Sequence, residues 1–238
     1  AGRRRRADDR VSALAGRTVV VTRAREQAGA LCAALKALGA RVLPFPTIAL
    51  EPVADDAADR AVAGLGAYDW IAFTSANAVR FFWERLAAAG LASPPEQVRL
   101  AAVGEATAAA LAERGARAST MPEVFLGTAL ADALGPLERR RVLLPRSDIG
   151  REETAAALRA AGAVVDEVVV YRTVPARPAP EAWRALEAGV DAVTFTSPST
   201  VRGFLAAGGA AAERLIRRAA IACIGPVTGD AVRELGLP

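Results

Sequence analysis

Two Thr-Ser pairs are the first residues of this chain that could bind a ligand. Thr74-Ser75 and Thr196-Ser197 lie in copies of one motif, because residues 73–80 (FTSANAVR) return as residues 195–202 (FTSPSTVR). Each pair ends an apolar run and precedes a helical pattern, so its hydroxyls can cap the helix. The same hydroxyls, with the free N–H groups of the helix, can bind an anion. The two interpretations are compatible, and the candidate binding residues of the two copies are Thr74, Ser75, Asn77, Ser197 and Ser199.

Two glycines mark a second repeated motif. Val103-Gly104-Glu105-Ala106-Thr107 returns as Ile224-Gly225-Pro226-Val227-Thr228. Each glycine suits either a tight turn or a close approach of the backbone to a carboxylate or phosphate. The threonines follow one helical turn later, where their hydroxyls could also face a ligand. The motif is too short for a dinucleotide fingerprint, and no phosphate-binding loop of the Walker type occurs. Gly104, Thr107, Gly225 and Thr228 join the candidates.

Arg23 and Arg146 end the matching runs VVVTR and VLLPR. Arginine at a strand end can clamp a carboxylate with two hydrogen bonds. A surface ion pair explains each arginine equally well.

Tyr171 is the best candidate for a proton donor. It is one of two tyrosines and ends an apolar run in VYRT. The chain has no histidine, so the commonest general base is missing and no Ser-His-Asp triad can form. A phenol is protonated at neutral pH. The alternative is an interface aromatic whose hydroxyl is bonded to the backbone.

Composition excludes several other classes of protein. The two cysteines, Cys32 and Cys223, lie in apolar stretches and predict buried free thiols, with no metal or redox spacing.

The net charge of +4 is concentrated in the first ten residues, which hold five arginines and two aspartates. The nearly neutral remainder argues against nucleic-acid binding. No apolar run reaches the roughly 18 residues of a membrane span, and no secretory signal is present. The prediction is a cytoplasmic protein.

Strand and helix patterns alternate along the chain, which predicts an α/β fold with mostly parallel sheets. Strands are expected at 17–22, 41–50, 70–74, 99–103, 141–144, 164–173, 191–196 and 220–224, with a short one near 118. Helices are expected at 27–38, 56–65, 76–89, 105–114, 127–134, 152–161, 181–188, 200–207, 211–219 and 227–235. A proline-rich linker is expected from Pro175 to Pro180, and residues 1–15 as a disordered basic lead.

The motifs recur in one order at a spacing of about 120 residues, which is the size of a domain. Two related lobes are therefore expected, and ligands often bind between lobes. The repeat is unequal, because the counterpart of residues 118–134 would lie beyond Pro238. The second lobe is expected to lack a strand and a helix, through either a shortened chain or a further C-terminal segment.

As an ordered set, these motifs resemble the uroporphyrinogen-III synthase family over most of residues 16–238. The resemblance rests on Thr22-Arg23, the two Thr-Ser motifs, the two glycine motifs and Val170-Tyr171-Arg172-Thr173. It implies two flavodoxin-like α/β lobes joined by a two-stranded β-ladder, one lobe inserted in the other. One lobe would hold residues 16–48 and 176–238, and the other residues 51–172. The long extended segments 41–50 and 164–173 would form the ladder.

The resemblance also implies an activity. The family's substrate is hydroxymethylbilane, a linear tetrapyrrole polycarboxylate. The family turns it into uroporphyrinogen III with inversion of the last ring, and uses neither a metal nor an organic cofactor. Tyr171 would assist loss of hydroxide, and Thr74, Ser75, Thr107, Ser197 and Thr228 would line the cleft. The expected protein is a monomeric lyase of heme biosynthesis that binds this small molecule, with neither nucleic acid nor membrane as a partner.

Two other functions are weighed against this one. The first is a non-catalytic, two-lobed protein that binds small anions. The second is a DNA-binding regulator that uses the basic run Arg3–Arg6.

Overall fold

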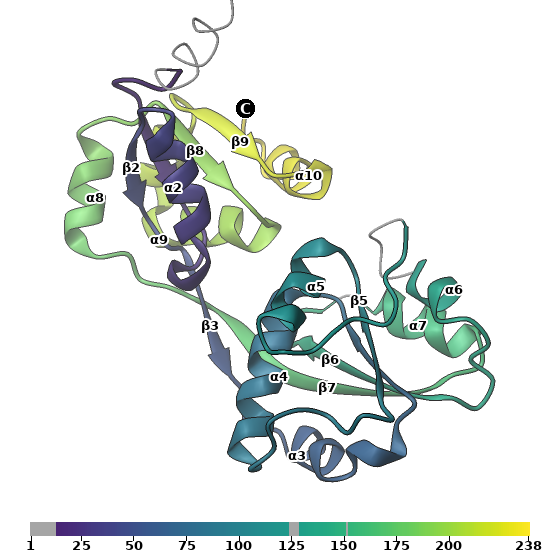
Figure 1. Ribbon diagram of the computed structural model, residues 1–238. Coiled ribbons are helices and arrows are strands. Elements are labelled where there is room, and N and C mark those ends of the chain that lie inside the picture. The colour runs from purple at the N-terminus through teal and green to yellow at the C-terminus, as the bar shows by residue number, and fades with distance from the viewer. Residues whose placement is uncertain (1–12, 124–128, 151) are drawn as a thin grey trace, which may run out of the picture. The chain divides into compact units, whose positions relative to one another are not determined.

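The computed structural model (Figure 1) describes residues 13–123, 129–150 and 152–238. The chain forms two compact units, one of residues 1–50 and 174–238 (unit 1) and one of residues 51–173 (unit 2). Unit 2 is therefore inserted in the sequence of unit 1. Most of the expected lead at residues 1–15, including Arg3–Arg6, lies outside the described residues. In the part of the chain that is described, no helix is long and apolar enough to cross a bilayer.

Unit 2 is built on a five-stranded sheet in the order β3-β7-β6-β4-β5. β4 pairs in parallel with β5 and β6, and β6 pairs in parallel with β7. The chain passes between the units within β3 and β7, which are neighbours in this sheet. The strands are β3 (Ile48–Pro52), β4 (Trp70–Phe73), β5 (Arg99–Ala102), β6 (Arg141–Ser147) and β7 (Val164–Pro175). The helices are α3 (Asp56–Ala63), α4 (Ala76–Ala88), α5 (Glu105–Ala112), α6 (Leu130–Leu134) and α7 (Glu153–Ala160).

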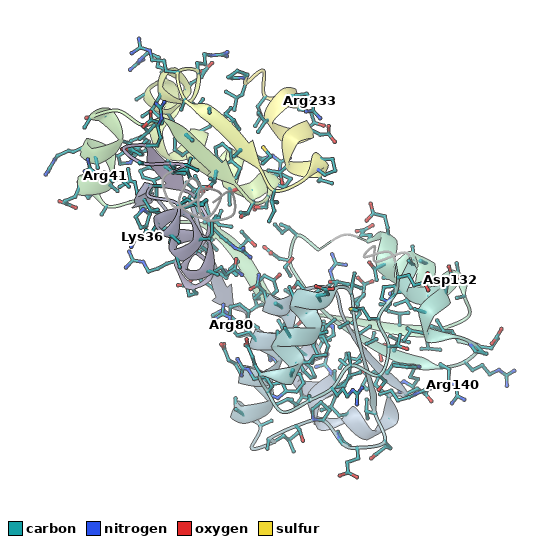
Figure 2. The ribbon with its side chains drawn as sticks, turned by 45° about the horizontal axis from the view of Figure 1, so that its top comes forward. Lys36, Arg41, Arg80, Asp132, Arg140 and Arg233 are labelled. Carbon is teal, nitrogen blue, oxygen red and sulfur yellow. The ribbon has the colours of Figure 1, made fainter. Side chains whose placement is uncertain are left out.

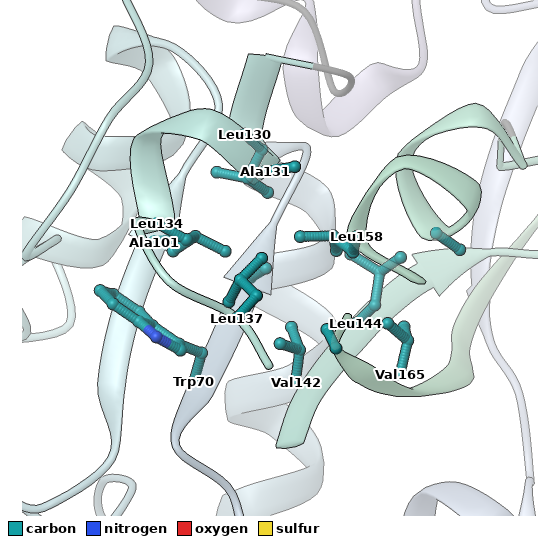
Figure 3. Packing of buried hydrophobic residues seen from close by; sticks show 13 residues of the cluster. Trp70, Ala101, Leu130, Ala131, Leu134, Leu137, Val142, Leu144, Leu158 and Val165 are labelled. Atoms are coloured by element: carbon teal, nitrogen blue, oxygen red, sulfur yellow. The ribbon is translucent and has the colours of Figure 1, made fainter. Parts of the chain in front are cut away.

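Alternating side chains of β4 serve the two faces of this sheet. Trp70 and Ala72 belong to the cluster that α6 and α7 cover with Leu130, Leu134 and Leu158, as Figure 3 shows. Phe73 faces α4, where its ring meets Phe82 edge-to-face at 5.6 Å. β4 is buried along its whole length. This explains why its sequence is a continuous apolar run, because a strand that is covered on both faces has apolar residues at every position.

Unit 1 is built on a four-stranded parallel sheet in the order β2-β1-β8-β9. Val20, Val193 and Phe195 of this sheet pack against Leu186, Phe204 and Ile216 of the helices. The strands are β1 (Thr18–Val21), β2 (Arg41–Pro44), β8 (Ala192–Phe195) and β9 (Ala220–Cys223). The helices are α2 (Gly29–Ala37), α8 (Pro180–Glu187), α9 (Pro198–Ile216) and α10 (Pro226–Glu234). The two sheets confirm the predicted α/β fold with two parallel-sheet lobes.

The sheets differ at one edge. In unit 2, Thr120 forms a parallel bridge with Ala101 of β5, where a short strand was expected. In unit 1, the equivalent strand β9 is at the edge of the sheet. The helix expected at 127–134 covers only Leu130–Leu134, and residues 127 and 128 lie outside the described residues.

Two details correct the sequence predictions. Cys32 and Cys223 are free but half-buried, because α2 buries no residue and β9 is an edge strand. Pro175 ends β7 and is not part of a linker. The two helices expected at 200–207 and 211–219 are confirmed as the two helical segments of α9, which are separated at Gly209, where φ is 51° and ψ is −134°.

Candidate active site

The carboxyl ends of β4 and β5 bring two helix N-termini to one edge of unit 2. Ser75 has extended backbone and precedes α4, and its Oγ accepts a hydrogen bond from the Ala78 N–H at 3.1 Å. Gly104 precedes α5. The Val103 N–H donates to the Phe73 carbonyl at 2.9 Å, which ties the two strand ends together. Both helices therefore direct their free N–H groups to the same edge.

Gly104 has φ 89° and ψ 159°, a conformation that is close to glycine-only. No side chain caps α5 in the structure. Gly104 was predicted either to form a tight turn or to approach a ligand. Its backbone conformation by itself requires a glycine at this position.

Tyr171 reaches this edge from β7. A register shift at Arg146 and Ser147 sets Tyr171 opposite Ser147, at the carboxyl end of β6. Its ring stacks on Phe81 of α4, with centroids 5.0 Å apart and planes 14° apart. Its hydroxyl lies 3.4 Å from Ser75 Oγ, and the residue is only 7% exposed. The structure thus brings together two residues that were predicted separately, and among the described residues the phenol contacts a side chain, at a distance near the limit of a hydrogen bond.

The other tyrosine, Tyr68, has a different environment. Its hydroxyl donates to Asp166 Oδ2 at 2.8 Å, and Arg141 donates to the same oxygen. Burial, followed by the hydrogen bond to Asp166, raises the pKa of Tyr68 to about 12. Tyr68, Arg141 and Asp166 line a cavity of about 520 Å³ near the amino ends of β6 and β7. Tyr171 is therefore the tyrosine placed among helix N-termini.

The other candidates of unit 2 have varied surroundings. Thr74 and Asn77 are half-buried beside Ser75. Thr107 is 3% exposed, and its hydroxyl donates to the Val103 carbonyl at 3.1 Å. That hydroxyl is engaged within the helix.

Arg146 is bonded to protein groups. It forms an ion pair with Glu167, and its Nη2 donates to the Gly150 carbonyl at 2.6 Å. Burial raises the pKa of Glu167, but hydrogen bonds from Arg146 and Arg159 outweigh burial and hold that pKa below its ordinary value. The structure thus gives Arg146 a partly buried ion pair in place of the predicted surface one.

Unit 1 repeats the arrangement of strand ends. Ser197 precedes α9 and forms a reciprocal capping box with Thr200, and its Oγ lies 2.8 Å from Ser199 Oγ. The Ile224 N–H donates to the Phe195 carbonyl at 3.1 Å, as Val103 does to Phe73 in unit 2. Gly225 precedes α10 in ordinary extended backbone, with φ −172°.

The two remaining candidates of unit 1 lie in different settings. Thr228 is 3% exposed. Arg23 Nε donates to Gln27 Oε1 at 3.1 Å, across the short 3₁₀ turn at Arg25–Gln27.

Phe81, whose ring stacks on that of Tyr171, was not among the predicted site residues. Phe81 was expected only as a helix residue. Its adjacency to Phe82 was the available signal, because adjacent residues on a helix point in directions about 100° apart, so neighbouring rings can have different contacts. Phe82 contacts Phe73, whereas Phe81 contacts Tyr171.

The fold and these strand ends define a two-lobed α/β protein with hydroxyl and N–H donors after the parallel strands of each lobe. The chain belongs to the uroporphyrinogen-III synthase family, because the family described as uroporphyrinogen-III synthase HemD matches residues 29–238. A uroporphyrinogen-III synthase from Synechococcus elongatus is 36% identical over 231 residues, which cover 93% of this chain and 88% of that protein.

Solved structures agree with this assignment. The crystal structure of a mutant uroporphyrinogen III synthase from the extremely thermophilic bacterium Thermus thermophilus is 26% identical, covers 93% of this chain and 90% of that chain, and has a TM-score of 0.61. The uroporphyrinogen-III synthetase of Helicobacter pylori, at 19% identity, shares the fold with the same coverage and a TM-score of 0.63. None of these relatives supports the alternative of a non-catalytic anion-binding protein.

Proposed function

We propose that this protein is a lyase that cyclises hydroxymethylbilane to uroporphyrinogen III, with inversion of the last pyrrole ring and loss of water. Family membership supports the reaction. The contact between Tyr171 and Ser75 carries the assignment of the site, because it sets a proton donor beside the capped N-terminus of α4.

In the proposed mechanism, the phenol of Tyr171 donates its proton to the departing hydroxide. The C–O bond breaks, one water forms, and the substrate is left as an azafulvene that is still protonated on its ring nitrogen, so that its positive charge balances the phenolate. The azafulvene is attacked from the substituted position of the last pyrrole, which gives a spiro intermediate, and rearrangement inverts that ring. Ring closure releases one proton from the substrate, and this proton restores the phenol. Ser75 Oγ, 3.4 Å from the phenol oxygen, keeps the hydroxyl in place and can stabilise the phenolate between the two steps.

The carboxylates of the substrate need many donors. We propose that the N–H groups and hydroxyls after β4 and β5 bind carboxylates in unit 2, and that those after β8 and β9 do so in unit 1. The residues proposed for this role are Thr74, Ser75, Asn77, Gly104, Thr107, Ser197, Ser199, Gly225 and Thr228. Two arginines at other strand ends, Arg23 after β1 and Arg146 in β6, are proposed to bind carboxylates through their guanidinium groups. Positioning of a flexible linear substrate supplies much of the rate in such a site.

The isomer that forms tests the proposal. Hydroxymethylbilane closes without an enzyme to the type I isomer. Inversion of the last ring, which gives the type III isomer, therefore reports the action of the enzyme. We expect purified protein to give the type III isomer, measured by chromatography of the oxidised products. A product that is type I alone, at any protein concentration, would contradict the proposal.

A monomeric state and a cytoplasmic location remain predictions from the sequence. Native mass spectrometry of the purified protein tests the first, and fractionation of the cells that produce it tests the second.

A further inference from the structure

The repeated octet ends in an arginine in both copies, and the mechanism above leaves both arginines without a role. Arg80 and Arg202 each lie five residues after the capping serine of their helix. On a helix, a residue shares a face with the one three positions earlier, so Arg80 lies on the face of Asn77 and Arg202 on that of Ser199. The neighbouring positions Val79 and Val201 are buried. Each arginine therefore lies beside the core face of its helix, where Arg80 is half-buried and Arg202 is exposed.

The guanidinium of Arg80 is only partly bonded. It lies over the Phe81 ring, with Cζ 4.0 Å from the centroid, and Nη1 donates to Glu84 Oε1 at 3.4 Å, near the limit of a hydrogen bond. Nη2 is buried and has no hydrogen-bond partner among the described residues. A buried donor that is left unpaired is costly, and a carboxylate is the group that best satisfies a guanidinium.

This guanidinium is next to the proposed proton donor. Phe81 lies under Arg80 and is stacked on Tyr171, whose hydroxyl meets Ser75. Figure 2 labels Arg80 on α4. Within unit 2, the guanidinium, the two aromatic rings and the two hydroxyls are therefore in contact one after another. A carboxylate bound to Arg80 would lie close to the reacting end of the substrate.

We propose that Arg80 binds a carboxylate of the substrate beside Tyr171, and that Arg202 is its counterpart in unit 1. This inference rests on the proposed function, because the ligand is the tetrapyrrole polycarboxylate of that reaction. Arg202 is exposed and has no hydrogen bond or ion pair recorded within the described residues, so its full set of donors is available. The repeat therefore duplicates a charged carboxylate donor together with its helix cap.

Steady-state kinetics of Arg80→Gln test the inference, with formation of the type III isomer as the signal. Loss of one charged hydrogen bond made equally to substrate and transition state should raise KM by about 10-fold or more and leave kcat within a few-fold. Arg80→Lys keeps the charge without the planar fork and should give an intermediate KM. Arg202→Gln should raise KM in the same way.

Arg114→Gln is the matched control. Arg114 is an exposed arginine of unit 2 after the end of α5, so its loss changes the net charge equally and should leave KM unchanged. An unchanged KM in both Arg80→Gln and Arg202→Gln would overturn the inference, as would an equal rise in Arg114→Gln. If Arg80→Gln does not fold, Arg80→Lys and the exposed Arg202→Gln decide. Wild-type protein that forms no type III isomer would instead refute the proposed function.

Discussion

The two units build their strand ends from equivalent residues but use them differently. Phe73 and Phe82 meet edge-to-face at 5.6 Å in unit 2, and Phe195 and Phe204 do so at 5.8 Å in unit 1. In both units a serine caps the helix after this strand. In unit 1 the serine completes a capping box with Thr200, whereas in unit 2 it contacts Tyr171.

This difference suits a division of roles in the proposed reaction, with groups for substrate binding in both units and the proposed acid in unit 2 alone. Both units offer hydroxyls, helix N-termini and an arginine, as a substrate with carboxylates along its length requires. The chain has two tyrosines, both in unit 2, so a phenol reaches the strand ends only there. The repeat thus accounts for donors in both units, whereas the proposed acid, Tyr171 in β7, is present in unit 2 alone.

Loss of the Tyr171 hydroxyl should have the largest effect on activity. Tyr171→Phe keeps the ring that stacks on Phe81 but removes the proton donor, so kcat should fall by about 100-fold or more with KM nearly unchanged. Tyr68→Phe is the matched control at the other tyrosine and should keep its activity. Equal activity of Tyr171→Phe and wild type would remove Tyr171 from the mechanism.

Truncation of the paired rings tests whether the two cores are equivalent. Phe82→Ala and Phe204→Ala should each destabilise their own unit by about 3–5 kcal/mol, because each leaves a cavity among buried side chains. Hydrogen exchange followed by mass spectrometry assigns the loss of protection to residues 51–173 or to the rest. Faster exchange in both units from either variant would show that the units unfold together.

The two strand-end glycines should respond unequally to alanine. Gly104→Ala should cost about 1–3 kcal/mol, because φ is 89° there. Gly225→Ala should change the free energy of unfolding by less than about 0.5 kcal/mol, because its backbone is extended and a Cβ would meet no atom within 4 Å. Denaturant titration measures both. If Gly225 approaches a carboxylate, its alanine variant raises KM while its stability is unchanged.

Two equivalent aspartates should give the smallest effect. Asp69 accepts the Arg141 N–H and pairs with Arg140, and Asp191 accepts the Thr18 N–H and pairs with Arg17. In both, the backbone hydrogen bond comes first among the causes that lower the carboxyl pKa, and the arginine adds to it.

A lowered pKa in the folded state stabilises the protein above the unfolded pKa of about 4, and this stability is lost as pH falls through the folded value. Asp69→Asn and Asp191→Asn should therefore be less stable than wild type at pH 7, with the difference shrinking in acid. Urea titrations at neutral and acidic pH measure this. A difference that is independent of pH would mean that the charge is not the cause.

Much of the fold could be predicted because hydrophobic periodicity reports local structure. Most of the expected strands and helices are present within a few residues, and the unequal edge of the two sheets follows from the repeat alone. The one strand expected at 41–50 is instead two strands, β2 and β3, which belong to different sheets. Contacts between distant residues could not be predicted in this way. Arg146 was expected at the surface or on a ligand, but the pairing of β6 with β7 brings its side chain into an ion pair with Glu167, two residues before its partner in the register. Cys223 was expected to be buried, but its strand is at the sheet edge.

The sequence by itself determined the alternation of strands and helices and the duplicated serine, glycine and arginine motifs, and it predicted the ends of strands as the place for a ligand. These follow from local patterns, since each helix cap needs only neighbouring residues. Only the tertiary structure decided that Tyr171 meets Ser75, 96 residues away, with Phe81 under its ring. That contact depends on strand order and on a register shift between β6 and β7, which are set by packing across the sheet.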